Sequence, residues 1–182
     1  MGLIPTDYEL PVSNTTSKFG KLEMGENRFR FLATPTTCYR YWTEDMNGNS
    51  QKHVIKNASD APSGEKPKHM WAFPAWMDGE VKLMEIDKAT VLKELVKLDK
   101  SAEWGNLLHY DVIVTREGHQ RDTTYSTQPC PKSELPDEAK SAWQSFKDSY
   151  DPESIFDAGE TTTDPSNLPT NDNQSTTELP WE

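Results

Sequence analysis

Short runs of alternating apolar and polar side chains constrain the fold of this chain more than any other feature. The run NRFRFLA at residues 27–33 alternates strictly, with Phe29 and Phe31 on one face and Arg28 and Arg30 on the other. Such a pattern indicates a half-buried strand with its phenylalanines in the core.

Further strands are predicted by aromatic content, by alternation and by turn residues between runs. They cover residues 39–43, 69–77, 80–86, 107–116 and 121–127. Asp78-Gly79 separates two of them and predicts a hairpin. Pro74 lacks an N–H group, so we expect its strand to lie at a sheet edge or to carry a bulge there.

Two helices complete the prediction. Asp87 fits an N-cap, and residues 88–98 carry the apolar stripe Val91, Leu92, Leu95 and Val96. Pro136 opens a short helix with Ala139, Trp143 and Phe146 on one face. This order predicts a mainly β fold, an OB-like small β-barrel with one inserted helix and a short C-terminal helix; a β-sandwich is the alternative.

Charge divides the chain into regions. Residues 151–182 contain eight acidic residues and no Lys or Arg, within a total net charge of −11. We therefore expect a disordered acidic tail at 151–182, an OB-like nucleic-acid-binding domain at 19–150 and a flexible N-terminal arm at 1–18. Within the domain, the long polar stretch 44–68 predicts a functional or disordered insertion.

Catalytic motifs are absent from the sequence: it has no phosphate-binding glycine loop, G-x-S-x-G, H-E-x-x-H or C-x-x-C. We expect neither an enzyme nor a cofactor. Cys38, His53, His69 and Cys130 are too irregularly spaced to favour a zinc site over two reduced thiols and two polar histidines. Without a signal sequence or a long apolar run, the expected location is the cytoplasm, with no membrane contact.

Aromatic and basic residues alternate or follow one another in three places. Single-stranded DNA is bound by stacking of bases on aromatic rings while cations follow the phosphates. The candidate nucleic-acid-binding residues are Arg28, Arg30, Arg40, Trp42, Lys52, Lys56, Lys66, Lys68, Trp71 and Phe73. Because half of an alternating strand faces the core, a structural role is the alternative for each aromatic residue.

Four runs of the sequence can be compared with known proteins: FGKLEMGENRFRFL at 19–32, YRYWTEDMNG at 39–48, KPKHMWAFPAWM at 66–77 and WGNLLHYDVIVTREG at 104–118. Together they resemble a group of small bacteriophage single-stranded-DNA-binding proteins, and more distantly the T-even phage helix-destabilising protein. The resemblance implies an acidic tail that recruits phage or host replication proteins, here through Leu179, Pro180 and Trp181. The T-even protein carries a zinc module where this chain has residues 44–68 without cysteine ligands, so no metal is expected.

The predicted function is binding of single-stranded DNA without strong sequence preference, protecting it in replication, recombination or repair. We further expect the tail to inhibit binding until DNA displaces it. A protein–protein adaptor or inhibitor, whose tail mimics nucleic acid, is the alternative from another class. A nuclease is a third hypothesis.

Overall fold

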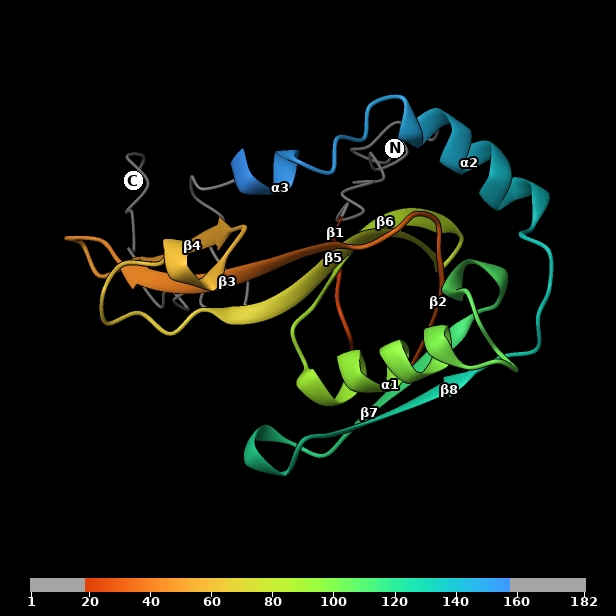
Figure 1. Ribbon diagram of the computed structural model, residues 1–182, viewed down its shortest axis with the longest axis horizontal. Helices are drawn as coiled ribbons and strands as arrows, with labels where there is room; N and C mark the ends of the chain where they lie inside the picture. Colours follow the sequence, from red (N-terminus) through yellow and green to blue (C-terminus); the bar gives the residue numbers. More distant parts are fainter. Residues whose placement is uncertain (1–18, 158–182) are drawn as a thin grey trace, which may run out of the picture. The chain divides into compact units, whose positions relative to one another are not determined.

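The computed structural model describes residues 19–157, which divide into two compact units (Figure 1). We call residues 19–38 and 69–152 the sheet unit, and residues 39–68 and 153–157 the hairpin unit. The predicted arm at 1–18, most of the predicted tail and its residues Leu179, Pro180 and Trp181 lie outside the described residues.

The fold is mainly β, with eight strands in one mixed sheet. The strands are β1 (Phe19–Gly20), β2 (Gly25–Phe31), β3 (Thr36–Glu44), β4 (Ser50–Ile55), β5 (Lys68–Met77), β6 (Glu80–Ile86), β7 (Val112–Glu117) and β8 (Thr124–Pro129). The main path runs β1-β6-β5-β2-β7-β8, and β3 pairs with β4 and β5. Only the β1–β6 pairing on this path is parallel. Among the described residues no pairing joins the two ends of the path, so the sheet is not closed.

The β5–β6 hairpin confirms the predicted turn. Asp78 and Gly79 both have positive φ angles, 54° and 79°, as a two-residue hairpin turn of type I′ requires. The prediction that Pro74 marks an edge or a bulge was wrong, because β5 pairs with β6 on one side and with β2 on the other. The Pro74 carbonyl accepts a hydrogen bond from the Leu32 N–H at 3.0 Å. The missing Pro74 N–H therefore points to the same side, away from β6, just past the end of β2.

The sheet unit contains the two longer helices, α1 (Ala89–Lys100) and α2 (Asp137–Lys147). Helix α1 begins one residue later than predicted, with Lys88 rather than Asp87 at the N-cap. Three members of the predicted stripe, Val91, Leu92 and Leu95, are buried, and the fourth, Val96, is half-buried. The predicted strand 107–116 is shorter, because Leu107–His109 forms a turn of 3-10 helix before β7. A second such turn, Gln120–Asp122, precedes β8.

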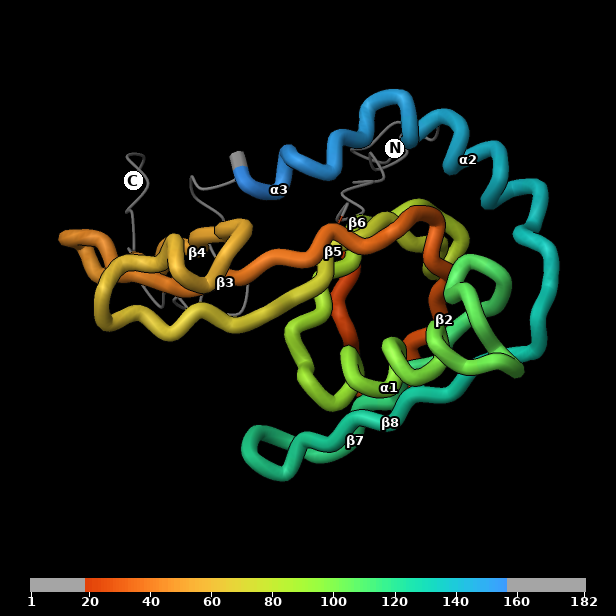
Figure 2. The backbone as a smooth tube through the Cα atoms, viewed as in Figure 1, coloured from red at the N-terminus to blue at the C-terminus, as the bar shows by residue number. Residues whose placement is uncertain are grey.

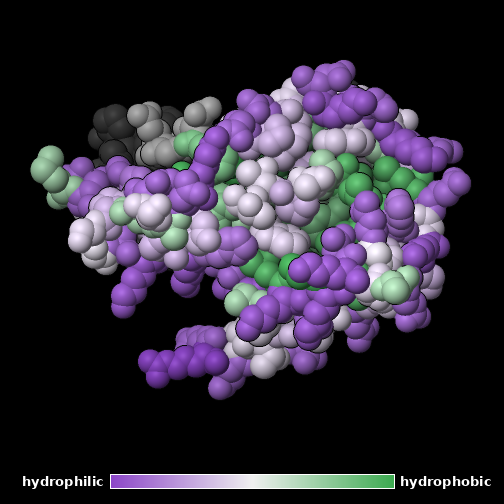
Figure 3. All heavy atoms as spheres, viewed as in Figure 1, coloured by the Kyte–Doolittle hydropathy of each residue, from purple (hydrophilic) through white to green (hydrophobic). Residues whose placement is uncertain are grey.

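A single apolar core fills the sheet unit. Phe29 and Phe31 of β2 face it as predicted, and the Phe31 ring stacks on Phe73 of β5 with 4.1 Å between ring centroids. Leu95 of α1 joins the same cluster. Figure 2 shows the backbone of this unit curving around the core, with α1 beside β8. On the face of this unit drawn in Figure 3, apolar residues lie near the centre and hydrophilic residues surround them.

The hairpin unit holds β4, the outer part of β3, one 3-10 turn at Ala58–Asp60 and the short helix α3 (Ser154–Asp157). Helix α3 falls inside the region predicted as a disordered tail. Within residues 19–157, no helix has the length and apolar character needed to span a membrane.

Candidate nucleic-acid interface

A tight turn joins β3 to β4 where the sequence predicted an irregular insertion. The Asp45 carboxylate accepts hydrogen bonds from the backbone N–H groups of Asn47 and Asn49, each at 2.8 Å. Together with bonds from the Asn49 side chain, these hold the pKa of Asp45 below its usual value. Gly48 supplies a positive φ of 80°. The Asn47-Gly48 pair was the sequence signal for this hairpin.

Residue pairing assigns the side chains of the hairpin to two faces. Trp42 lies opposite Lys52, and Arg40 lies opposite Val54. Directly paired residues share a face, and so do alternate residues along one strand. Arg40, Trp42 and Lys52, all predicted to bind nucleic acid, therefore share one face, which we call the Trp42 face. Trp42 is 37% exposed, which is unusual for a tryptophan.

The opposite face of the hairpin carries a second aromatic pair that the sequence analysis did not select. The rings of Tyr41 and His53 are stacked 4.7 Å apart at an interplanar angle of 13°. The Thr43 hydroxyl lies 2.7 Å from His53 Nε2 and fixes the orientation of the imidazole. We call this the His53 face. The alternation of Tyr39 and Tyr41 in the sequence indicated this face, because it places both tyrosine rings on the side of the strand away from Trp42.

The remaining basic candidates of this unit occupy different settings. Lys66 lies just before β5 and Lys68 is the first residue of β5, and both are exposed. Lys56 follows β4, forms an ion pair with Glu153, and its ammonium group lies 5.1 Å from the centre of the Phe156 ring. The first residues of the predicted acidic tail thus contact one of the predicted phosphate-binding lysines.

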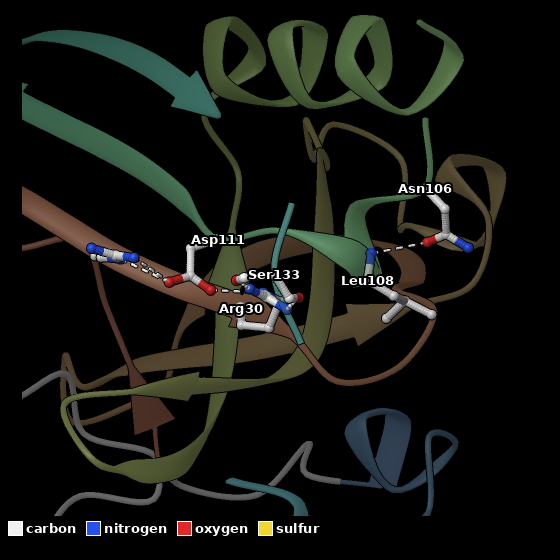
Figure 4. Close-up of polar contacts among 6 residues, drawn as sticks. Arg30, Asn106, Leu108, Asp111 and Ser133 are labelled. Atoms are coloured by element: carbon white, nitrogen blue, oxygen red, sulfur yellow. Dashed lines mark hydrogen bonds and ion pairs between the residues drawn. The ribbon is translucent and has the colours of Figure 1, made fainter. Parts of the chain in front are cut away.

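The sheet unit holds the other four candidates, and two of them are structural. Phe73 is fully buried in the core, so the prediction that it stacks on bases was wrong. Arg30 is 2% exposed, because Asp111 and Ser133 enclose it on the strand face that was expected to be open (Figure 4). Trp71 is half-buried, packs against the core and lies opposite Ile86.

Arg30 is the centre of a hydrogen-bond network. Its Nε donates to Asp111 Oδ1 at 2.6 Å, Nη1 donates to the Ser133 carbonyl at 3.0 Å, and Nη2 donates to Ser133 Oγ at 2.8 Å. A buried guanidinium needs a charged partner and further hydrogen bonds of this kind to offset its loss of hydration. Arg28 differs: its side chain is 63% exposed, and the Asp111 carboxylate beside it raises its pKa.

The cysteines and histidines considered for zinc do not gather. Cys38 and Cys130 are buried and unbonded to each other. Throughout residues 19–157, no group of three or more His, Cys, Asp or Glu side chains is arranged to hold a metal ion.

Comparisons with known proteins found no matching family model, no similar curated protein and no similar solved structure. The function is therefore inferred from the hairpin and from the surface of the sheet unit.

Proposed function

We propose that the chain binds single-stranded DNA without strong sequence preference and protects it during replication, recombination or repair. In this proposal it acts by binding and not by catalysis. The observation that carries the proposal is the Trp42 face of the hairpin, where a 37% exposed indole is paired with Lys52 on β4 and lies two residues from Arg40 on β3. An exposed ring offers a base a stacking surface worth about 1–3 kcal/mol, and flanking cations suit the phosphates on either side.

Two acidic residues of the hairpin unit, Asp45 and Asp60, lie in turns, whereas Glu44 lies at the end of β3 on the Trp42 face. Asp45 closes the β3–β4 turn, and Asp60 accepts hydrogen bonds from the backbone and side chain of Asn57 in the next turn. Both carboxylates accept hydrogen bonds from backbone N–H groups in the turns at the two ends of β4. The basic side chains lie along its strands and in the segment after them, where a nucleic-acid backbone would be attracted.

We further infer that the sheet unit is an open variant of an OB fold. What supports this is the order of its pairings. Strands β2, β5 and β6 pair in succession, α1 follows, β7 returns to pair with β2, and β8 pairs with β7. Five such strands with a helix after the third are typical of OB folds, which bind oligonucleotides through the first and last inter-strand loops. In this assignment the β3–β4 hairpin lies within the first of those connections.

The acidic tail has a regulatory and recruiting role in the proposal. The contact of Lys56 with Glu153 and Phe156 supports competition between the C-terminal segment and phosphates for the same lysine. Leu179, Pro180 and Trp181 form the only concentrated apolar group near the end of the acidic region. When DNA displaces the tail, we expect these residues to bind a replication partner.

A tryptophan-fluorescence titration tests the proposal. Full-length chain is titrated with dT oligomers and with duplex DNA at two salt concentrations. We expect quenching by the single strand, with an affinity that falls steeply as salt rises because phosphate neutralisation releases counterions. Absence of single-strand binding, both by the full chain and after removal of residues 151–182, would reject this function and favour the protein–protein adaptor.

A further inference from the structure

The sheet unit has a shallow surface pocket of about 280 Å³, which borders the core at Phe29 and Met77. Its lining includes Arg28 and Arg30 of β2, Trp76 of β5, and Asp78 and Asp111. Ligand pockets for drug-sized molecules start at about 300 Å³, so this one suits a single flat group such as one nucleobase.

Sheet register explains why an indole and a guanidinium meet there. Trp76 is paired directly with Arg30 across β2 and β5, so both belong to the face opposite the phenylalanines. Arg28 lies two residues before Arg30 and therefore shares that face. A diagonal neighbour on adjacent strands is about 7–8 Å away between backbone positions, within reach of two long side chains.

Asp111 holds the Arg28 side chain in a fixed orientation. Arg28 Nε and Nη2 both lie 2.7 Å from Asp111 Oδ2, while Asp111 Oδ1 accepts from Arg30. A guanidinium carries more N–H donors than this pair uses, so further donors of Arg28 remain available at its exposed end. The other carboxylate of the pocket, Asp78, is paired with Lys82 at 2.9 Å.

We propose that this pocket binds one nucleotide unit of single-stranded DNA, with the base against the Trp76 indole and a phosphate on Arg28. Asp111 is then a positioning residue, since it orients Arg28 without contacting the DNA. The inference rests on the proposed single-strand binding and adds Trp76, which the sequence analysis did not select. The ligand class follows from the pair itself: an aromatic surface for any base and a planar cation for a phosphate.

Photo-cross-linking tests this pocket directly. A dT oligomer containing 5-iododeoxyuridine is bound to the full-length chain, irradiated and analysed by peptide mass spectrometry. We expect cross-linked peptides that contain Trp76 in addition to those that contain Trp42. In parallel titrations, Arg28→Gln should weaken binding about tenfold and reduce the salt slope by about one, as loss of one phosphate contact predicts.

The Trp76 variants separate stacking from folding. Trp76→Leu should weaken binding about tenfold, and Trp76→Phe, which keeps an aromatic ring, should bind nearly as the natural chain does. If Trp76→Leu does not fold, the Arg28→Gln variant, which changes an exposed side chain, and the cross-link still test whether the pocket binds a nucleotide. Binding with cross-links at Trp42 alone and unchanged affinity of Arg28→Gln would overturn the pocket and leave the hairpin site intact. Absence of any single-strand binding would overturn the proposed function as well.

Discussion

Strands β2 and β3 carry similar patterns of alternating aromatic and basic residues but place them in different environments. In β2, Phe29, Phe31 and Arg30 are all at most 2% exposed. In β3, Trp42 is 37% exposed, and Arg40 and Tyr41 are half-buried. Strand β2 pairs with β5 and β7, whereas the outer part of β3 pairs with β4.

This difference shows what alternation encodes. In both strands, alternation along the sequence determines which side chains share a face. Whether a face stays open depends on the segments that pack on it, and these come from distant parts of the chain. Asp111 and Ser133 cover the arginine face of β2 at Arg30 although they lie more than 80 residues away in sequence.

The largest expected effect is loss of stability in the sheet unit on removal of a core ring. Phe73→Ala should lower the free energy of unfolding by about 3–5 kcal/mol, because Phe73 is fully buried and stacked on Phe31. Chemical denaturation measures this loss. Affinity of the folded fraction for a dT oligomer should stay unchanged. A loss of affinity without a loss of stability would indicate instead that the Phe73 ring contacts the DNA.

Loss of the hydrogen bonds around Arg30 should also lower the stability of the sheet unit. Asp111→Asn removes the charge that pairs with a 2% exposed guanidinium, so we expect a loss of about 1.5–3 kcal/mol in the free energy of unfolding. Thermal and denaturant unfolding provide the measurement. Ser133→Ala, which removes one neutral hydrogen-bond acceptor of the same arginine, should cost less. Equal and negligible losses for both variants would contradict a structural role for Arg30.

Lysines of the hairpin unit should affect binding and leave stability unchanged. Lys66→Ala combined with Lys68→Ala should weaken binding to all sequences about equally and flatten the salt slope by roughly two. Titrations of dT oligomers over a range of salt concentrations measure the slope. Lys93→Ala with Lys97→Ala, on exposed positions of α1, is a matched control for total charge. An unchanged salt slope would show that Lys66 and Lys68 do not contact the phosphates of the bound DNA.

The smallest expected effect concerns the C-terminal contact with Lys56. Both side chains of the Lys56–Glu153 pair are exposed, 58% and 62%, so the pair is worth at most about 1 kcal/mol. Glu153→Gln should tighten single-strand binding by a few-fold at low salt, with the gain fading as salt rises. Asp148→Gln, a loss of the same charge in the sheet unit, is the comparison. Equal tightening by both variants would indicate a general charge effect and no competition at Lys56.

Much of the fold followed from the sequence because its signals are local. The β5–β6 hairpin, the stripe of α1 and the Ala139 face of α2 depend on turn residues and periodicity within one segment. Strand β4 was missed because its polar residues, SQKHVI, resemble a solvated loop, although Asn47-Gly48 marked the turn before it. Polar strands are stabilised by their partner, and that partner, β3, was predicted.

The candidate site was only partly predictable, for a different reason. Alternation selected Arg40 and Trp42, and the position of Lys52 in a basic stretch between two aromatic strands selected that lysine; all three share one hairpin face. The sequence pattern also selected Arg30 and Phe73, because a single strand does not reveal a second covering layer. Trp71 and Trp76 belong to the same run, yet Trp71 faces the core and Trp76 the pocket. The register of β5 against β2 and β6 was needed to decide which of the two tryptophans faces the core.

Stacking of DNA bases on the exposed indole of Trp42 is tested most directly by one measurement. The affinity of Trp42→Ala for a dT oligomer is compared with that of His53→Ala, its neighbour on the opposite face of the same hairpin, with each value referred to the folded fraction. We expect Trp42→Ala to weaken binding by about 1–3 kcal/mol while its melting temperature changes little. The His53→Ala change should have the smaller effect on affinity. Unchanged affinity of Trp42→Ala, or a loss explained entirely by unfolding, would contradict the account.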